Sequence, residues 1–169
     1  MEINVTVTPK YEELYNLFER AFNEILHDET GYFTEDLNQD KLADWFDFDE
    51  MLKYLPYGKL IEARDDVGTL VGAAFIAKQN PISWLDGHKA ELFIIGLLPG
   101  TQNKGLGSAI LKRCENEAKI FDAQSIIINA HSMQPELHKF YEKNNYKRMG
   151  ELIDYYANGN AIFFSKKLS

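Results

Sequence analysis

Residues 96–109, with the sequence GLLPGTQNKGLGSA, decide the fold. They follow an apolar run, residues 89–98, that predicts a strand, and they lead into residues 105–121, where apolar side chains recur at helical spacing. A glycine-rich loop between a strand and a helix presents backbone N–H groups at the helix N-terminus, where the helix dipole is positive. Phosphate groups bind at such places. We therefore expect a phosphate-containing ligand at this loop.

The spacing of the glycines narrows the kind of phosphate ligand. The loop lacks the GxxxxGK[ST] spacing of a P-loop. It also fails the dinucleotide fingerprint, because Ile110 stands where the third glycine belongs and the next predicted strand ends in Asn129-Ala130 without an acidic residue. A nucleotide-binding protein is therefore disfavoured. Residues 102–107 fit a different pattern, Q-x-x-G-x-G.

This hexapeptide resembles the coenzyme A pyrophosphate loop of the GNAT superfamily of acyl-CoA N-acyltransferases. Downstream, residues 140–146, FYEKNNY, resemble the F-Y-E-K-x-G-F motif of the family. Asn145 replaces the glycine there, and asparagine also tolerates the left-handed conformation at the end of a helix. Upstream, Glu91 stands eleven residues before Gln102, where several family members place a catalytic glutamate. Gln134 departs from the family, which usually has asparagine at this position.

The resemblance implies direct transfer of an acetyl group from acetyl-CoA to an amine, without a covalent enzyme intermediate. Tyr141 is the expected general acid near the sulfur, and a packed core tyrosine is the alternative. Glu91 is the expected base, directly or through water, and a solvated carboxylate is the alternative. The Leu97 N–H is expected to polarise the thioester oxygen. The residues expected at coenzyme A are Leu97, Leu98, Gln102, Asn103, Lys104, Gly105, Leu106, Gly107, Ser108, Asn129 and Gln134.

The pattern of apolar residues predicts one α/β (α+β) domain over residues 1–169. We expect a mixed, mostly antiparallel central sheet of about seven strands with helices on both faces, the fold of GNAT-like N-acetyltransferases. The strand at 125–129 follows a helix and should pair in parallel with the strand at 89–98 through a right-handed crossover. The expected strands are residues 3–7, 59–64, 69–78, 89–98, 125–129, 146–154 and 161–166, and the expected helices are 14–25, 42–54, 105–121 and 135–145.

Composition excludes several classes of protein. The formal net charge of −8 argues against a general nucleic-acid binder, which carries a basic face. The single cysteine, Cys114, permits no internal disulfide and is expected to pack inside a helix. The four histidines form no pair at metal-ligand spacing, so no metal is expected. His131 is expected in a loop after the strand at 125–129, and a position facing the acceptor cleft is the alternative. No apolar stretch is long enough to span a membrane, so we expect a cytoplasmic protein without a membrane partner.

Charge is unevenly distributed along the chain. Residues 12–54 contain thirteen acidic and three basic side chains, a net of −10. In the family, the first two helices form one wall of the acceptor cleft, so the acidic segment favours a cationic amine, on a small molecule or a peptide. A solvated acidic surface is the alternative.

The sequence therefore predicts an acetyl-CoA-dependent N-acetyltransferase. A non-catalytic acyl-CoA-binding sensor or interaction module on the same fold is the alternative function. The oligomeric state stays open, with a homodimer among the choices.

Overall fold

The computed structural model describes residues 1–6, 10–26, 53, 55–78, 88–156 and 159–169, which form one seven-stranded sheet. The strand order is β1-β2-β3-β4-β5-β7-β6. Its strands are β1 (Glu2–Thr6), β2 (Gly58–Arg64), β3 (Leu70–Lys78), β4 (Lys89–Leu97), β5 (Ser125–His131), β6 (Lys147–Tyr156) and β7 (Gly159–Lys167). The described helices are α1 (Tyr11–Leu26), the 3-10 turn η2 (Leu55–Tyr57), α3 (Leu106–Ile120) and α4 (Pro135–Lys143).

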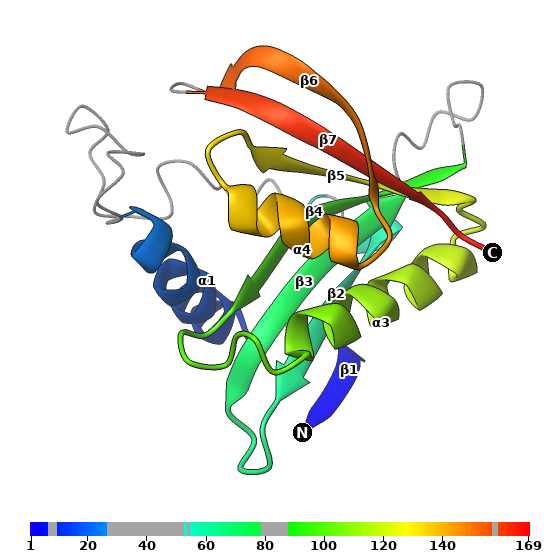
Figure 1. Ribbon diagram of the computed structural model, residues 1–169. Helices are drawn as coiled ribbons and strands as arrows, with labels where there is room; N and C mark the ends of the chain where they lie inside the picture. The colour runs from blue at the N-terminus through cyan, green and yellow to red at the C-terminus, as the bar shows by residue number, and fades with distance from the viewer. Residues whose placement is uncertain (7–9, 27–52, 54, 79–87, 157–158) are drawn as a thin grey trace.

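The sheet is mixed, as the sequence predicted. β4 and β5 pair in parallel, because α3 carries the chain from the end of one strand back to the start of the other. Every other described pair of neighbouring strands is antiparallel. Helix α1 lies on one face of the sheet, and α3 and α4 lie on the other (Figure 1). The predicted α/β fold class is therefore confirmed.

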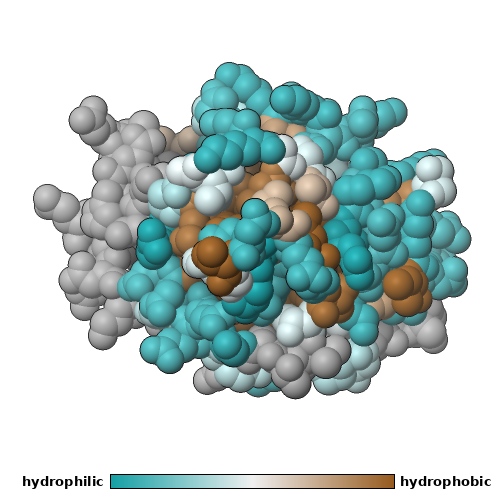
Figure 2. Space-filling model, turned by 90° about the horizontal axis from the view of Figure 1, so that it is seen from below, coloured by the Kyte–Doolittle hydropathy of each residue, from teal (hydrophilic) through white to brown (hydrophobic). Residues whose placement is uncertain are grey.

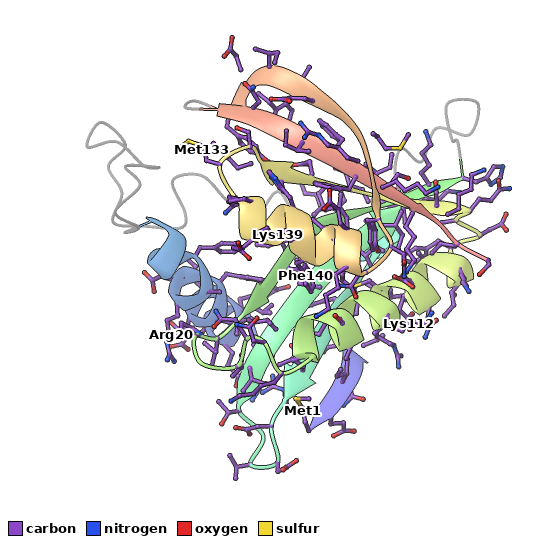
Figure 3. The ribbon with its side chains drawn as sticks, viewed as in Figure 1. Met1, Arg20, Lys112, Met133, Lys139 and Phe140 are labelled. Carbon is purple, nitrogen blue, oxygen red and sulfur yellow. The ribbon has the colours of Figure 1, made fainter. Side chains whose placement is uncertain are left out.

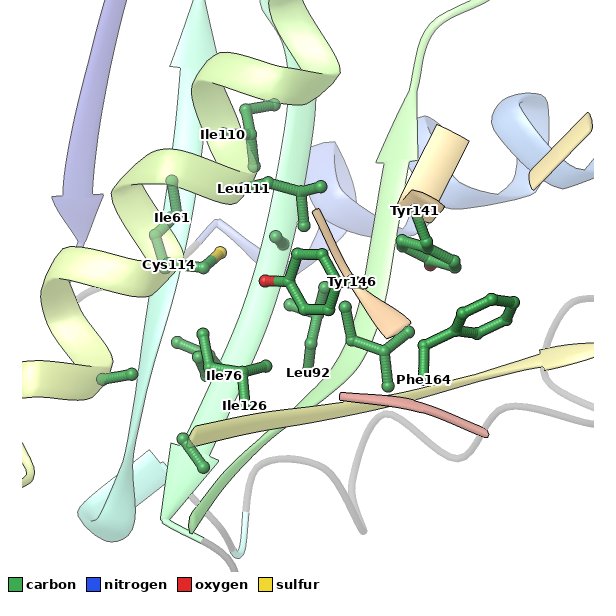
Figure 4. Close-up of a cluster of buried hydrophobic side chains, with 14 of the residues drawn as sticks. Ile61, Ile76, Leu92, Ile110, Leu111, Cys114, Ile126, Tyr141, Tyr146 and Phe164 are labelled. Carbon is green, nitrogen blue, oxygen red and sulfur yellow. The ribbon is translucent and has the colours of Figure 1, made fainter. Parts of the chain in front are cut away.

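Two apolar clusters hold the helices against the sheet. On the face of α3 and α4, Ile110 and Cys114 pack with strand residues such as Ile76 and Ile126 (Figure 4). On the face of α1, Phe18 packs with Phe75 and its neighbours. The strand β3 is therefore buried on both faces, which explains why its sequence is apolar throughout. Cys114 is fully buried, and burial raises the pKa of its thiol, as expected for a packed side chain.

The structure corrects one expectation at the end of β5. The strand continues two residues beyond Asn129, because β7 pairs with it as far as the Ala161 partner of His131. His131 is therefore a buried strand residue, and the expectation of a loop histidine was wrong.

Some expectations lie outside the described residues. They include residue 7 of the first expected strand and every residue of the helix expected at 42–54 except Lys53. Within the described parts of the chain, no helix is long and apolar enough to cross a membrane. The same parts contain no group of three His, Cys, Asp or Glu side chains arranged to hold a metal ion.

Candidate functional site

The loop between β4 and α3 exposes a run of backbone amides. Gly100, Asn103 and Gly105 have positive φ angles of 81°, 60° and 82°, which turn the chain tightly before the helix. Among the residues that the structure describes, no acceptor meets any amide N–H from Gln102 to Ser108. The first turn of α3 therefore keeps its unpaired donors and the positive end of its dipole, which suits an anionic ligand.

The glycines at the start of α3, Gly105 and Gly107, serve different purposes. Gly105 is the N-cap of α3, and a Cβ there would meet nothing within 4 Å. Glycine is therefore favoured at this position by the left-handed backbone and not by lack of space. A Cβ on Gly107 would lie 3.1 Å from the ring of Phe140 on α4. Phe140 lies between α4 and the start of α3 (Figure 3). The absence of a side chain at Gly107 therefore lets α4 approach the loop.

The side chains of the loop make contacts within the loop. Gln102 Oε1 accepts a hydrogen bond from the Gly100 N–H at 3.3 Å, and Lys104 Nζ donates to the Gly100 carbonyl at 2.9 Å. Gln134, also expected at coenzyme A, is the residue before α4 and donates its N–H to the His131 carbonyl. The structure therefore places residues 102–108 together and places Gln134 at the end of β5.

The sheet opens beside this loop. The pairing of β4 with β5 ends at Leu92 and Ile128, although β4 continues along β3 and β5 continues along β7. A β-bulge shifts the register of β4 against β3 between Leu92 and Ile94, and a bulge bends the strand that carries it. Beyond the bulge the two strands diverge (Figure 1), and we call the space between them the gap.

The backbone of β4 points unpaired groups into the gap. Leu98 donates its N–H to the Val71 carbonyl at 3.0 Å, and its own carbonyl accepts from Thr101. Because hydrogen-bonding direction alternates along an antiparallel strand, the N–H groups of Leu97 and Ile95 point away from β3 and toward the gap. The expectation that the Leu97 N–H polarises the thioester oxygen stays a prediction, and the direction of this N–H is compatible with it. Sequence reasoning missed Ile95, whose orientation depends on the bulge.

Tyr141 lies on the α4 side of the gap. Its side chain is 2% exposed and packs against Phe164 and Tyr146, with ring centroids 5.5 and 6.0 Å away (Figure 4). The ring of Phe140 lies 5.4 Å away. Burial raises the pKa of its phenol, so the hydroxyl stays protonated at neutral pH. The nearby Tyr156 contributes to this rise. No acceptor for the Tyr141 hydroxyl is found among the described residues.

Glu91 lies on the opposite face of the sheet. It pairs with Ala77, whose side chain belongs to the cluster under α1. Burial raises the pKa of the Glu91 carboxyl, and no cation among the described residues offsets this effect. A carboxylate with a raised pKa gains basicity at neutral pH. The expected acid and the expected base therefore approach the sheet from different faces.

Asn129 is the first residue of β5 beyond the last pair with β4. It lies on the same face as Glu91, two residues beyond Ile127, which pairs with Glu91. Its side-chain oxygen accepts a hydrogen bond from the hydroxyl of Tyr156 on β6. Sequence reasoning did not single out Tyr156. The only local sign was its position between the strands predicted at 146–154 and 161–166.

The end of the molecule with the β2–β3 turn and the loop before α3 is mostly hydrophilic. Figure 2 shows polar side chains around an apolar area on this face. An anionic ligand with an apolar arm matches such a surface, because the polar edge and the unpaired amides suit the anion.

Comparison with known proteins identifies the family. The sequence profile described as the Acetyltransferase (GNAT) family matches residues 11–146. The chain belongs to the GNAT acetyltransferase family. The matched region includes α1, the loop before α3, the gap and Tyr141, so the resemblance read from the sequence is confirmed.

Individual proteins agree with this assignment. Mycothiol acetyltransferase of Propionibacterium freudenreichii is 34% identical over 87 residues, a match that spans 50% of this chain and 24% of that protein. The chain therefore spans about a quarter of the length of this curated relative.

Solved structures share the fold at low identity. The structure of an aminoglycoside 6'-N-acetyltransferase complexed with coenzyme A has a TM-score of 0.72 and 16% identity, and the match covers 100% of this chain and 98% of that one. A GNAT family acetyltransferase from Elizabethkingia anophelis with acetyl-CoA bound has a TM-score of 0.70 and 15% identity, with 99% and 97% covered.

Proposed function

We propose that this protein transfers an acetyl group from acetyl-CoA to a primary amine by direct attack. The observation that carries the proposal is the run of unpaired amides at residues 102–108 beside a sheet that opens between β4 and β5. The amides suit a pyrophosphate, and the gap suits an extended arm that pairs with the free N–H groups of Ile95 and Leu97. Two coenzyme A-bound members of the fold support this choice of ligand.

The residues around the gap supply the other requirements of the reaction. Acetyl-CoA supplies an activated acyl carbon. Glu91 accepts one proton from the attacking amine, directly or through water, and the amine nitrogen forms the new C–N bond. The Leu97 N–H stabilises the negative charge that develops on the carbonyl oxygen. Tyr141 donates its proton to the departing sulfur as the C–S bond breaks.

Binding of the co-substrate tests the first half of the proposal. Coenzyme A at 100 times its Kd should stabilise the fold by about 2.7 kcal/mol, which a thermal-shift titration detects. ATP and NAD at the same concentration should give no comparable shift. Protection by ATP or NAD without protection by coenzyme A would overturn the proposed ligand.

A matched pair of variants locates the binding site. Gly105→Asp places a negative charge beside the pyrophosphate, whereas Gly105→Asn has the same shape without the charge, and both residues tolerate the left-handed backbone. We expect Gly105→Asp to lose coenzyme A affinity far more than Gly105→Asn. Equal losses would place the anion elsewhere.

Transfer is tested by release of free thiol from acetyl-CoA with a panel of amines, namely benzylamine, spermidine and a tripeptide with a free N-terminus. Mass spectrometry should find one acetyl group on the amine for each thiol released. A protein that binds coenzyme A tightly and acetylates no amine would instead support the acyl-CoA-binding module as its function.

A further inference from the structure

Tyr156 and Asn129 form a polar pair at the mouth of the gap, on the same face as Glu91. The Tyr156 hydroxyl donates to Asn129 Oδ1, although β7 lies between the strands that carry the two residues. The Tyr156 ring stacks on His131, with centroids 4.8 Å apart and an interplanar angle of 20°. The pair therefore connects β5 to β6 across β7.

The surrounding structure fixes this arrangement. A Cβ on Gly159 would lie 2.3 Å from the ring of His131, so this glycine leaves the space that the imidazole occupies. The Asn160 side chain accepts a hydrogen bond from the Asp154 N–H at 3.0 Å and donates to Glu151 at 2.7 Å. Tyr156 is thus held between its neighbours before any ligand arrives, as a substrate-positioning group must be.

The hydrogen bonds of the pair leave an acceptor available. A tyrosine hydroxyl has one proton, and Tyr156 gives it to Asn129, so the lone pairs of its oxygen remain free for a donor. Burial, with a smaller contribution from Tyr155, raises the pKa of Tyr156 to about 12, so the phenol is neutral in the physiological range.

The attacking nucleophile has its own requirements. A neutral primary amine has one lone pair and two N–H bonds. If the lone pair faces the acyl carbon, one N–H gives its proton to the base and the other remains to be held by an acceptor. An alcohol has a single O–H, which the base must take, so it has no second proton for such a contact.

We propose that Tyr156, held by Asn129, accepts a hydrogen bond from the acceptor amine and positions its nitrogen against the acyl carbon, with Glu91 on the same face. This inference rests on the proposed function. Tyr156 keeps its own proton throughout, so no group is transferred to it. The site then selects nucleophiles that retain an N–H while they attack, which favours primary amines over alcohols.

Steady-state kinetics of the Tyr156→Phe variant test this inference. The substitution keeps the ring that stacks on His131 and removes only the oxygen. Tyr155→Phe is the matched control, because this neighbouring tyrosine is 51% exposed and has no part in the pair. With the amine that the wild-type protein uses best from the panel, we expect KM for the amine to rise about tenfold in Tyr156→Phe and to stay unchanged in Tyr155→Phe.

Comparison of the KM for the amine with the Kd for acetyl-CoA separates a positioning role of Tyr156 from a structural role. In Tyr156→Phe the Kd for acetyl-CoA should match that of the wild type, because the ring is kept, and the melting temperature should fall only slightly, because one part-buried hydrogen bond to Asn129 is lost. The double variant Asn129→Ala/Tyr156→Phe should have the same amine KM as Tyr156→Phe alone, since Asn129 acts through the hydroxyl.

Three outcomes overturn the inference, and they differ from one another. An amine KM within twofold of wild type in Tyr156→Phe shows that the hydroxyl does not meet the amine. Equal losses of acetyl-CoA affinity and amine KM show a structural role. Absence of transfer to every amine by the wild-type protein removes the proposed function, and this inference with it.

Discussion

Tyr141 is a proton donor or a core side chain, and one substitution separates the two. Its hydroxyl has no acceptor among the described residues, so Tyr141→Phe costs the fold no hydrogen bond. If the hydroxyl protonates the leaving sulfur, turnover should fall by about 10²-fold or more at unchanged coenzyme A affinity. Stopped thiol-release assays and thermal unfolding measure the two quantities.

Tyr146→Phe provides the control for this prediction. Tyr146 is equally buried, and its hydroxyl has no hydrogen-bond partner among the described residues. It lies beside Glu115 and under the Lys166 amine. We expect this variant to retain full activity. Equal turnover of Tyr141→Phe and Tyr146→Phe would show that Tyr141 is a core side chain and not the proton donor.

The Glu91→Gln substitution should raise the stability of the protein and lower its activity. Burial raises its pKa, so the folded state holds this proton more tightly than the unfolded state. Stability is therefore lost as pH rises from the ordinary carboxyl pKa through the raised value, because the buried group must ionise. Glu91→Gln removes this cost, so the variant should unfold at a higher temperature than wild type at about pH 7.5, with a smaller difference below about pH 4.

The activity of Glu91→Gln should fall most above the raised pKa of the Glu91 carboxyl, because there the wild-type carboxylate is ionised and can take a proton from the amine. A variant with the wild-type pH profile would assign this role to another group. Glu62→Gln is a useful contrast, because Glu62 also lies half-way along a strand but bonds Arg64 at 3.1 Å. Its loss should lower stability at neutral pH.

At the scale of elements, Gly107 sets the distance between α3 and α4. A Cβ there meets the Phe140 ring at 3.1 Å, closer than ordinary van der Waals contact. Gly107→Ala should therefore lower the free energy of unfolding by about 1–3 kcal/mol, measured by chemical denaturation. Phe140→Leu in the same chain should recover part of this loss, because the smaller side chain leaves room.

Gly105→Ala is the control for Gly107→Ala, since its cost comes from the backbone alone. Its φ of 82° disfavours alanine by about 1–2 kcal/mol, and no neighbour lies within 4 Å. Phe140→Leu should not relieve it. If Phe140→Leu restored the stability of both variants to the same extent, the role of Gly107 would not be to make room for Phe140.

Local chemistry explains which parts of the site could be predicted from the sequence. The helix after the loop follows from its apolar stripe, and the left-handed Asn145, with φ 66°, follows from its place at the end of α4. These features depend on residues close in the chain. The same holds for the loop before α3, whose glycines and following helix lie within one short segment.

Other parts depend on strands that are distant in sequence. The Tyr156–Asn129 hydrogen bond requires β7 to lie between β5 and β6, and the sequence does not specify that order. The bulge at Phe93 is equally hidden, because no glycine or proline marks it. It decides where the sheet opens and which amides face the gap. Sequence patterns therefore predict the ligand loop better than they predict the acceptor side.

At the scale of the whole molecule, charge is the property that bears on the acceptor. The chain carries a formal net charge of −8, and residues 12–54 alone carry −10. Part of this segment is described, and there Glu13 bonds Arg64 at 2.6 Å, which lowers the pKa of the Glu13 carboxyl. Glu13 is thus already neutralised by the protein. Most of the remaining acidic residues, from Asp28 to Glu50, lie outside the described residues.

We expect these acidic residues to attract cationic amines toward the acceptor side. A field of this kind acts over the Debye length, which shrinks from about 30 Å at 0.01 M salt to about 8 Å at 0.15 M. The kcat/KM for spermidine should therefore fall steeply over this range, while that for benzylamine, with a single charge, should fall much less. Asp47→Asn/Asp49→Asn should flatten the spermidine dependence, whereas Glu136→Gln, on exposed α4 and paired with Lys139, should not. Equal slopes for the two amines would mean that the acidic segment is a solvated surface, and that recognition of the acceptor depends on contacts at the gap.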